Sequence, residues 1–342
     1  MQNQQSYKSA FIILIVVLLC CFFINISLGS VSIPLHGVFE SIFGNPDNES
    51  WSYIIQNYRL PKAITAILVG SGLGISGLLM QTLFRNPLAG PFVLGISSGA
   101  SLGVALVILG SGLFGGAFAI LLTSKWSVVI AASLGSFLVL LAVLIVSSRV
   151  RDTMAILIIG LMFASITGAI VGVLSYFSSA EQLQRYVFWG FGSLGNLSWQ
   201  ELAIFGVIYS IGLLLSLASI KALNTLLLGD NYAKSLGLNI KQSRLFIIVA
   251  TSLLAGTITA FAGPIAFIGL AIPHLTRLVF NTSNHKILLP AVVLFGGIIM
   301  LICDTIAQIP NSDYTLPINA ITSLVGAPIV IWLLVRKRNL MF

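Results

Sequence analysis

The sequence predicts an all-α integral membrane protein, built as a single ten-helix transmembrane bundle. Of its 342 residues, 57% are hydrophobic and only 8% are charged, and the mean hydropathy is +1.05. A soluble domain carries about 25% charged residues, so this chain lacks the polar groups that would cover a surface in water. The composition therefore excludes a large soluble domain, a disordered chain and a nucleic-acid-binding domain.

Ten apolar segments account for most of the chain. A helix needs roughly 20 residues to cross a bilayer. The predicted spans cover residues 9–29, 60–83, 93–113, 126–147, 154–177, 200–220, 245–263, 265–280, 287–307 and 316–335. No small-residue cleavage site follows the first segment, so we interpret it as a span and not as a signal peptide. The loop between the first two spans is predicted to hold a short interfacial helix over residues 35–43.

The distribution of charge predicts how the spans are oriented. Ten spans place both termini on one side of the membrane. With that side taken as the cytoplasm, 13 of the 17 Lys and Arg residues face inward and seven of the nine acids face outward. This sorting follows the positive-inside rule and supports the count of ten. We therefore expect both termini in the cytoplasm.

The predicted spans hold almost no ionisable residues. Asp304 lies near the outer part of the ninth span, and His274 and Arg277 lie toward the inner end of the eighth. Charged groups at the bilayer centre cost about 2.5–3.5 kcal/mol or more, and those present usually have a function. An ion-coupled secondary transporter, a channel or a voltage sensor would need such groups near the midplane. Any uphill transport is therefore expected to draw its energy from outside the bilayer.

The motifs of a membrane enzyme are missing as well, so we predict no catalytic residue and no metal site. One match to the dinucleotide fingerprint G-x-G-x-x-G occurs at residues 72–77, but it lies inside an apolar span, without the preceding strand that the motif needs. Small residues spaced by four instead favour close helix packing in lipid. Three glycine pairs have this spacing, at 70 and 74, 99 and 103, and 168 and 172.

Two polar stretches flank the second span. Residues 59–62 (Arg-Leu-Pro-Lys) lie at its outer mouth, and could either anchor lipid headgroups or dock an acidic partner. Residues 81–91 follow its inner end. Pro87 and Pro91 forbid a continuous helix there, which predicts a stiff cytoplasmic turn that is either a plain loop or the rim of a pathway.

The longest cytoplasmic segment, residues 221–244, has the pattern of two short helices. Asp230 is predicted to cap a helix over residues 231–236 that ends at Gly237, and Asn239 to cap a second helix over 240–244. Leu236 and Leu238 flank the glycine, which suits either a groove on another protein or the membrane surface.

Two further stretches lie near the outer face. Residues 180–199 predict a short outer helix whose Trp189 and Trp199 fit an aromatic belt. The eighth span begins at a Gly263-Pro264 break. It contains a lone histidine, His274, for which packing or a hydrogen bond is favoured over metal binding because no second ligand is nearby.

Together, these stretches resemble one family, the permease subunits of type II ABC importers for iron complexes, siderophores and cobalamin. The resemblance covers nearly the whole chain in the family's order. It rests on R-x-P-R at 59–62, Q-x-x-x-x-N-P-L-A-x-P at 81–91 with G-x-S-x-G-A at 95–100, S-L-G at 235–237, G-x-I-x-F-I-G-L-x-x-P-H-x-x-R at 263–277, and P-x-x-x-x-T-x-x-x-G-A-P at 317–328.

The resemblance implies a function and a set of partners. The chain would be a non-enzymatic permease in the bacterial inner membrane, working as a homodimer with the pathway at the subunit interface. Two ATPase subunits would bind in the cytoplasm and carry the ATP and Mg, so this subunit would need no cofactor of its own. A substrate-binding protein would deliver the cargo outside. The implied cargo is an iron-siderophore or related iron chelate, with cobalamin or heme as alternatives.

The resemblance also implies roles for individual residues. The segment 221–244, called the coupling segment below, would contact the ATPase, and Arg59 and Lys62 would dock the binding protein. Residues with implied roles are Asp230, Ala233, Ser235, Leu236, Gly237 and Leu238 for ATPase coupling, Asn86, Leu88 and Thr153 for a cytoplasmic gate, and Pro87, Pro91, Gly263, Pro273, His274 and Arg277 for the structural motifs.

Four positions depart from the family pattern at the outer face. Lys62 replaces an arginine, which weakens bidentate pairing with a carboxylate. Gln308 lies where a further docking arginine is common, and Thr315 and Asn319 replace a usual Glu and Gly. Docking contacts are therefore expected to differ in part from those of the family.

Overall fold

The computed structural model describes residues 4–44, 48–113, 124–147, 153–309, 312 and 314–336. Every regular element within these ranges is helical, which confirms the predicted all-α fold. In chain order the elements are α1 (Gln4–Ser27), α2 (Leu35–Phe43), α3 (Glu49–Ile54), η1 (Ile55–Arg59), α4 (Leu60–Phe84), η2 (Pro91–Leu94), α5 (Ile96–Ile108), η3 (Gly110–Leu113), α7 (Lys125–Ser147), α8 (Thr153–Tyr176), α9 (Ala180–Gly190), α10 (Trp199–Ala218), α11 (Ile220–Leu226), α12 (Asp230–Ser235), α13 (Ile240–Ala262), α14 (Ile268–Phe280), α15 (His285–Ala307) and α16 (Ile318–Arg336).

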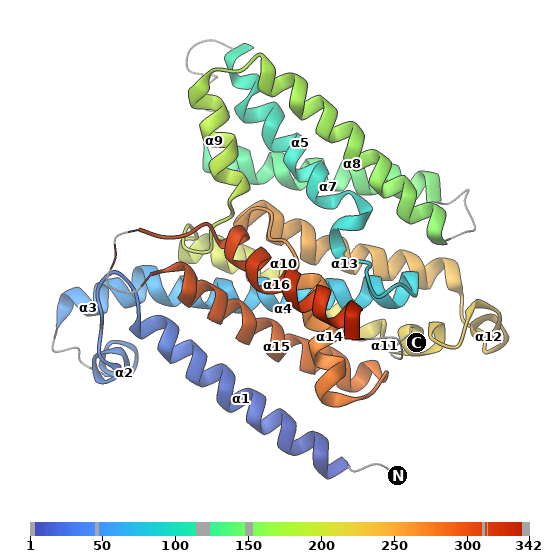
Figure 1. Ribbon diagram of the computed structural model, residues 1–342, viewed down its shortest axis with the longest axis horizontal. Coiled ribbons are helices and arrows are strands. Elements are labelled where there is room, and N and C mark those ends of the chain that lie inside the picture. Colours follow the sequence, from blue (N-terminus) through green and yellow to red (C-terminus); the bar gives the residue numbers. More distant parts are fainter. Residues whose placement is uncertain are drawn as a thin grey trace.

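Helix α4 forms the centre of the bundle. Most of its residues are buried, and it packs against α10, α13, α14 and α15. Helices α5, α7, α8 and α9 make a second group, which joins the first through α13 (Figure 1). Helix α1 begins, and α16 ends, at the same end of the bundle as α12, whereas α2 and α3 lie at the other end (Figure 1). We call these the inner and outer ends.

Within the described ranges, seven helices are long and apolar enough to cross a membrane, and they correspond to seven of the predicted spans. The third, eighth and tenth predicted spans correspond to shorter apolar helices, α5, α14 and α16. Helices α5 and α14 have 13 residues each, which is about 20 Å of helix against a hydrocarbon core of about 30 Å. The multi-pass helical fold is confirmed, and ten crossings stay a prediction.

Two loop predictions meet different outcomes. The helix expected over residues 35–43 is present as α2, and its apolar Leu35, Phe39 and Phe43 are exposed, while its place at the membrane interface stays a prediction. The short helix predicted over 240–244 and the span predicted over 245–263 are parts of one helix. Helix α13 runs unbroken from Ile240 to Ala262, because no proline or glycine interrupts it before Gly256.

Glycines set the closest helix contacts, as predicted from their spacing. A Cβ at Gly70 would overlap the backbone of Gly296 on α15, and one at Gly77 would overlap the carbonyl of Gly269 on α14. Residues 72–77 are therefore packing positions inside α4 and not a cofactor loop. The pair on α8 behaves differently, because a Cβ at either Gly168 or Gly172 would meet no described atom within 4 Å.

Candidate functional site

Residues 86–90 make a tight turn at the inner end of α4, and we call them the gate loop after the role that the sequence resemblance implies. The helix stops at Arg85, whose φ of +46° lies in the left-handed region. The Asn86 side chain accepts a hydrogen bond from the Leu88 amide (2.9 Å), and the Asn86 carbonyl accepts one from the Ala89 amide (3.0 Å). Leu88 is exposed, so this turn presents an apolar side chain at the inner end.

Helix α14 holds the gate loop from one side. His274 donates from Nε2 to the Pro87 carbonyl (2.8 Å), and Arg277 donates from Nη1 to the Gln81 side chain (2.8 Å). Pro273 is buried within the same helix. His274 is thus a hydrogen-bonded histidine, and the described residues contain no group of three or more His, Cys, Asp or Glu that could hold a metal ion.

The remaining motif residues lie at close approaches or at a helix start. Pro91 packs against Gly269, where a Cβ would come within 2.8 Å of the proline ring. Gly263 ends α13 with a φ of +76°, and a Cβ there would come within 2.8 Å of the Trp189 carbonyl. Thr153 is the first residue of α8, and its side chain lies outside the described part of the structure.

Within the coupling segment, α12 and the start of α13 are joined by a glycine turn, and α11 precedes them. Gly237 has a φ of +82° and ends α12, as predicted. Asn239 caps α13 by accepting a hydrogen bond from the Gln242 amide (3.2 Å), also as predicted. The predicted cap at Asp230 is wrong. Gly229 is the N-cap residue of α12, and Asp230 is the first helical residue.

One face of the coupling segment is apolar and exposed. Tyr232 is 69% exposed and Leu236 is 66% exposed, four residues apart, and Leu228, in the turn before α12, is also exposed. These three exposed residues are called the inner apolar stripe. Ala233 is buried, and Leu238 is only half-exposed because it packs on the core. The tip expected from two leucines is therefore formed by Leu236 together with a tyrosine.

The Asp230 side chain turns toward the bundle instead of capping its helix. Its Oδ1 lies 2.9 Å from Nη2 of Arg85, and its Oδ2 lies 2.7 Å from Nη2 of Arg244. Arg85 also donates from Nε (3.2 Å) and Nη2 (2.9 Å) to the Leu226 carbonyl. A direct link therefore connects α12 with the last residue before the gate loop.

At the outer end, Arg59 is a structural residue. It is only 8% exposed, and it donates to the carbonyls of Ile26 (2.7 Å), Ser27 (2.9 Å) and Val31. These bonds tie the end of α1 to the start of α4. The exposure expected for Arg59 is thus wrong, and its docking role stays a prediction without that support.

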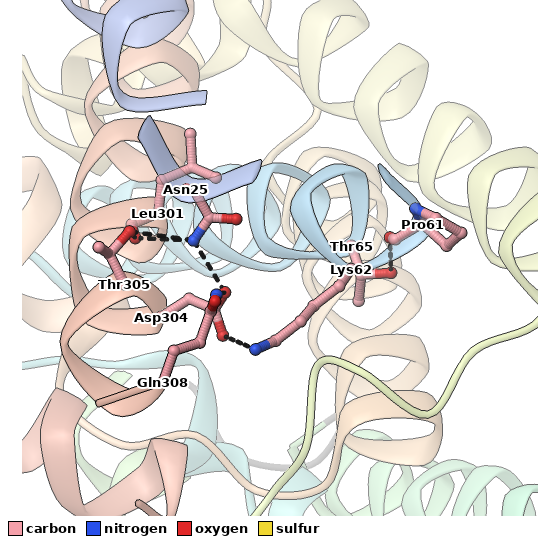
Figure 2. Close-up of polar contacts among 8 residues, drawn as sticks. All are labelled: Asn25, Pro61, Lys62, Thr65, Leu301, Asp304, Thr305 and Gln308. Atoms are coloured by element: carbon pink, nitrogen blue, oxygen red, sulfur yellow. Dashed lines mark hydrogen bonds and ion pairs between the residues drawn. The ribbon is translucent and has the colours of Figure 1, made fainter. Parts of the chain in front are cut away.

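Lys62 lies one turn further along α4 and forms an ion pair inside the molecule. Its Nζ is 3.1 Å from Oδ1 of Asp304 on α15. The other carboxylate oxygen accepts hydrogen bonds from Asn25 (2.9 Å) and Gln308 (2.7 Å). Figure 2 shows this cluster, in which α1, α4 and α15 meet. Lys62 keeps a 21% exposed side chain, whereas Asp304 is buried to 3%. Docking by Lys62 stays a prediction.

A cavity of about 700 Å³ opens beside this cluster at the outer end. Lys125 lies in its wall and pairs with Glu201 (2.7 Å), just as Lys62 pairs with Asp304, so the two cations and two acids balance. Aromatic rings make much of the remaining wall, namely Phe188, Trp189, Phe191 and Phe261. This cavity is mainly apolar, with charges that are already neutralised.

Asn319 fastens the helix that covers this cavity. Its backbone amide donates to the Phe191 carbonyl (3.1 Å), its Nδ2 donates to the Gly190 carbonyl (3.3 Å), and its Oδ1 accepts from the Ala266 amide (3.0 Å). Three segments therefore meet at one side chain. A glycine at this position, as is usual in the family that the sequence resembles, could not make the two side-chain bonds.

Several of these residues were missed by sequence reasoning. Asp304 is a lone acid in a predicted span. An acid inside the membrane is expected to pair with another polar or charged group, and this rule is the signal that points to Lys62. Arg85 and Asp230 lie 145 residues apart, and the side chain of Asn319 bonds to backbone groups 53 and 129 residues away, so these contacts carry no local signal. The pair of Asp230 with Arg244 spans only 14 residues.

Comparisons with known proteins agree on one family. The model of the FecCD transport family matches residues 15–336. The Yersinia pestis hemin transport system permease protein HmuU is 35% identical over 317 residues, which cover 92% of this chain and 93% of that protein. The Klebsiella pneumoniae vitamin B12 import system permease protein BtuC is 37% identical over 286 residues, 83% of each chain.

Solved structures give the same result. An inward-facing conformation of a metal-chelate type ABC transporter aligns with a TM-score of 0.83 and 30% identity, over 96% of this chain and 100% of the other. PsaBC from Streptococcus pneumoniae aligns with a TM-score of 0.53 and 17% identity, over 88% of this chain and 100% of that one, which shows a shared fold alone.

Proposed function

Because the chain belongs to the FecCD transport family of ABC importer permeases, we propose that it is the membrane subunit of an ATP-driven importer of metal chelates. It acts as a homodimer, with two ATPase subunits at its inner end and a substrate-binding protein at its outer end. Chemistry takes place on the ATPase subunits, where ATP and Mg bind, and this subunit supplies the pathway and needs no cofactor.

The inner apolar stripe is the observation that carries the ATPase proposal. Leu236 and Tyr232 are about two-thirds exposed on a short helix outside the predicted spans. Transferring such side chains out of water is favourable by roughly 1.5–3 kcal/mol each when burial is complete. A groove on an ATPase subunit would bury them, whereas a lone permease leaves them uncovered.

A second copy of the chain is proposed to pack against α8. Gly168 and Gly172 lie one turn apart on this helix and meet no described atom within 4 Å. In other parts of the bundle, glycines at this spacing lie where two helices come close, as Gly70 does with Gly296. Small residues of this kind let two membrane helices approach closely. The stripe on α8 is therefore suited to a partner helix.

The cargo is proposed to be an iron-siderophore or a related iron chelate, with heme and cobalamin as alternatives. The names of the relatives support the broader class, since one is a hemin permease and others are vitamin B12 permeases. Within that class, the gate loop and Thr153 are proposed to close the pathway on the cytoplasmic side. Both termini are proposed to lie in the cytoplasm.

Docking of the binding protein is proposed at the outer end beside Lys62. This side chain is part-exposed, and it is the member of the basic pair that a partner acid could reach. Arg59 is proposed to act there indirectly, by shaping the loop that follows α1. Docking on one exposed cation would be sensitive to salt, because exposed charges are screened within roughly 8–10 Å at physiological ionic strength.

An ion-coupled secondary transporter is the competing function, and it needs a carboxylate free to take up a cation. Among the described residues, the buried acid Asp304 is already paired with Lys62 and accepts two amide hydrogen bonds. Glu201 is paired with Lys125. These pairs favour a transporter whose energy comes from ATP.

Proteoliposomes test this choice directly. The full chain is reconstituted with an ATPase subunit and a substrate-binding protein from the same organism, and the uptake of a ferric siderophore, hemin and cyanocobalamin is compared. Uptake of at least one chelate that requires ATP, and persists when ion gradients are collapsed, is expected. Uptake that stops with the ion gradient and ignores ATP would overturn the proposal.

A further inference from the structure

One carboxylate at the inner end is shared by two arginines from different helices. Oδ1 of Asp230 pairs with Arg85 (2.9 Å) at the end of α4, and Oδ2 pairs with Arg244 (2.7 Å) in the first turns of α13. Asp230 itself begins α12. Each oxygen of the Asp230 carboxylate therefore binds an arginine from a different helix. As a result, α12 is attached to both α4 and α13.

Arg85 is attached to the coupling segment at more than one point. Besides the pair with Asp230, it donates twice to the Leu226 carbonyl at the end of α11. An isolated exposed ion pair contributes little, but a network of charges with good geometry contributes more. Here one guanidinium group bridges a carboxylate and a backbone carbonyl, which fixes its position relative to both α11 and α12.

The backbone of Arg85 is also the last point of α4 before the gate loop. Its φ of +46° is unusual for a residue with a side chain, so the surrounding contacts must hold it there. Asn86 follows directly, and the far side of the loop is held by the bond from His274 to the Pro87 carbonyl (2.8 Å). A displacement of α12 would thus be transmitted to the gate loop through Arg85.

We propose that Asp230 and Arg85 are positioning residues that couple α12 to the gate loop, and that Asp230 does not bind the ATPase itself. The inner apolar stripe provides the contact surface, and the shared carboxylate transmits its movement. The transmission step rests on the proposed function, since an ATPase must move α12. The link between α12 and the gate loop is a property of this chain alone.

Hydrogen exchange on the purified full-length chain in lipid nanodiscs tests the link. The variants are Asp230→Asn, Arg85→Gln and the double variant, and the readout is the exchange rate of amides in residues 86–90. Each single variant should raise this rate severalfold. The double variant should raise it no further, because both changes break one connection. Asp230→Glu, which keeps the charge, should restore most of the protection.

Lys241→Gln is the matched control. It removes a cation from the first turn of α13, close to Arg244 in the sequence, and its side chain is exposed. Exchange in the gate loop should stay at the wild-type rate in this variant. Unchanged exchange in Asp230→Asn and Arg85→Gln, or an effect of the double variant equal to the sum of the singles, would overturn the coupling role.

A second arm uses the assembled complex and separates this inference from the proposed function. The probe is Leu88→Cys, in a background with the three native cysteines replaced by alanine, labelled with a water-soluble maleimide with and without ATP. Asp230→Asn should still co-purify with the ATPase but lose the ATP-dependent change in labelling.

Two other outcomes are informative. If Asp230→Asn loses the ATPase while amide exchange in the gate loop stays at the wild-type rate, Asp230 is an ATPase contact and the inference is overturned. Failure of the wild-type chain to bind an ATPase would contradict the proposed function and leave the exchange result standing.

Discussion

The ammonium group of Lys62 lies 3.1 Å from the carboxylate of Asp304, a residue 242 positions later in the chain. Asn25 and Gln308 donate hydrogen bonds to the other oxygen of this carboxylate. The pair holds α4 and α15 together at the outer end, beside the cavity, and it explains why an acid can lie inside a predicted span.

Removing one partner of this pair should lower the free energy of unfolding more than removing both partners. Asp304→Asn leaves the Lys62 cation without its counter-charge, and breaking a buried pair costs about 3–5 kcal/mol. Lys62 is part-exposed, so we expect a smaller loss, of about 2 kcal/mol. The double variant Asp304→Asn/Lys62→Gln should recover part of it. Thermal unfolding in detergent compares both variants with the wild type, and equal losses in the single and double variants would contradict a net role for the pair.

Arg59→Ala should destabilise the outer end instead of acting only on docking. The change leaves the carbonyls of Ile26, Ser27 and Val31 without their donor. An unsatisfied buried polar group costs about 1–3 kcal/mol, so a loss of several kcal/mol is expected. Arg185→Ala serves as the control, since Arg185 makes an exposed ion pair with Glu181. The midpoint of thermal unfolding should fall clearly for Arg59→Ala and barely for the control.

Substitution of glycine should be tolerated on α10 but not on α4. Gly77→Ala would push a Cβ into the Gly269 carbonyl, whereas Gly206→Ala meets no described atom within 4 Å. Overpacking of a tight core costs about 1–3 kcal/mol, and more where backbone must move. Size-exclusion profiles after heating should show early loss of the Gly77 variant only. Equal stability of the two variants would mean that α4 and α14 are less closely packed than described.

Gly237→Val should impair transport without unfolding the bundle. The residue has a φ of +82°, and nothing lies within 4 Å of an added Cβ, so the cost is backbone strain of about 1 kcal/mol or more. Gly237→Asn is the control because asparagine adopts this conformation more readily. Uptake should fall in the valine variant and be largely kept with asparagine, at equal yield of folded protein. Equal uptake in both would show that the turn is not under strain.

The outline of the fold could be predicted from the sequence because lipid imposes long apolar helices. Apolar runs located the helices, Gly237 and Asn239 marked the turn of the coupling segment, and the glycine spacing indicated tight packing. Hydrogen bonds between distant segments could not be predicted. Arg59 looked like an exposed cation because its acceptors are backbone carbonyls, which leave no mark in the side-chain pattern.

The inner end shows the same limit. Asp230 has the position of a helix cap by sequence, but two arginines compete for its carboxylate, and they lie 145 positions before it and 14 after it. Leu238 looked equivalent to Leu236, yet it packs on the core while Leu236 stays exposed. Local pattern predicted α12 and the start of α13 but not α11. Tertiary contacts decided which side chains of the coupling segment stay exposed.

The most direct test of the central claim is co-purification of the ATPase with the Leu236→Asp variant, measured beside uptake of the labelled chelate. The variant places an unpaired charge in the proposed groove, at a position outside the predicted spans. Leu35→Asp, which changes an exposed leucine of α2 at the outer end and outside the predicted spans, is the matched control. We predict that Leu236→Asp folds normally but loses both the ATPase and the uptake, while the control keeps the ATPase. Normal co-purification and normal uptake in Leu236→Asp would contradict the account.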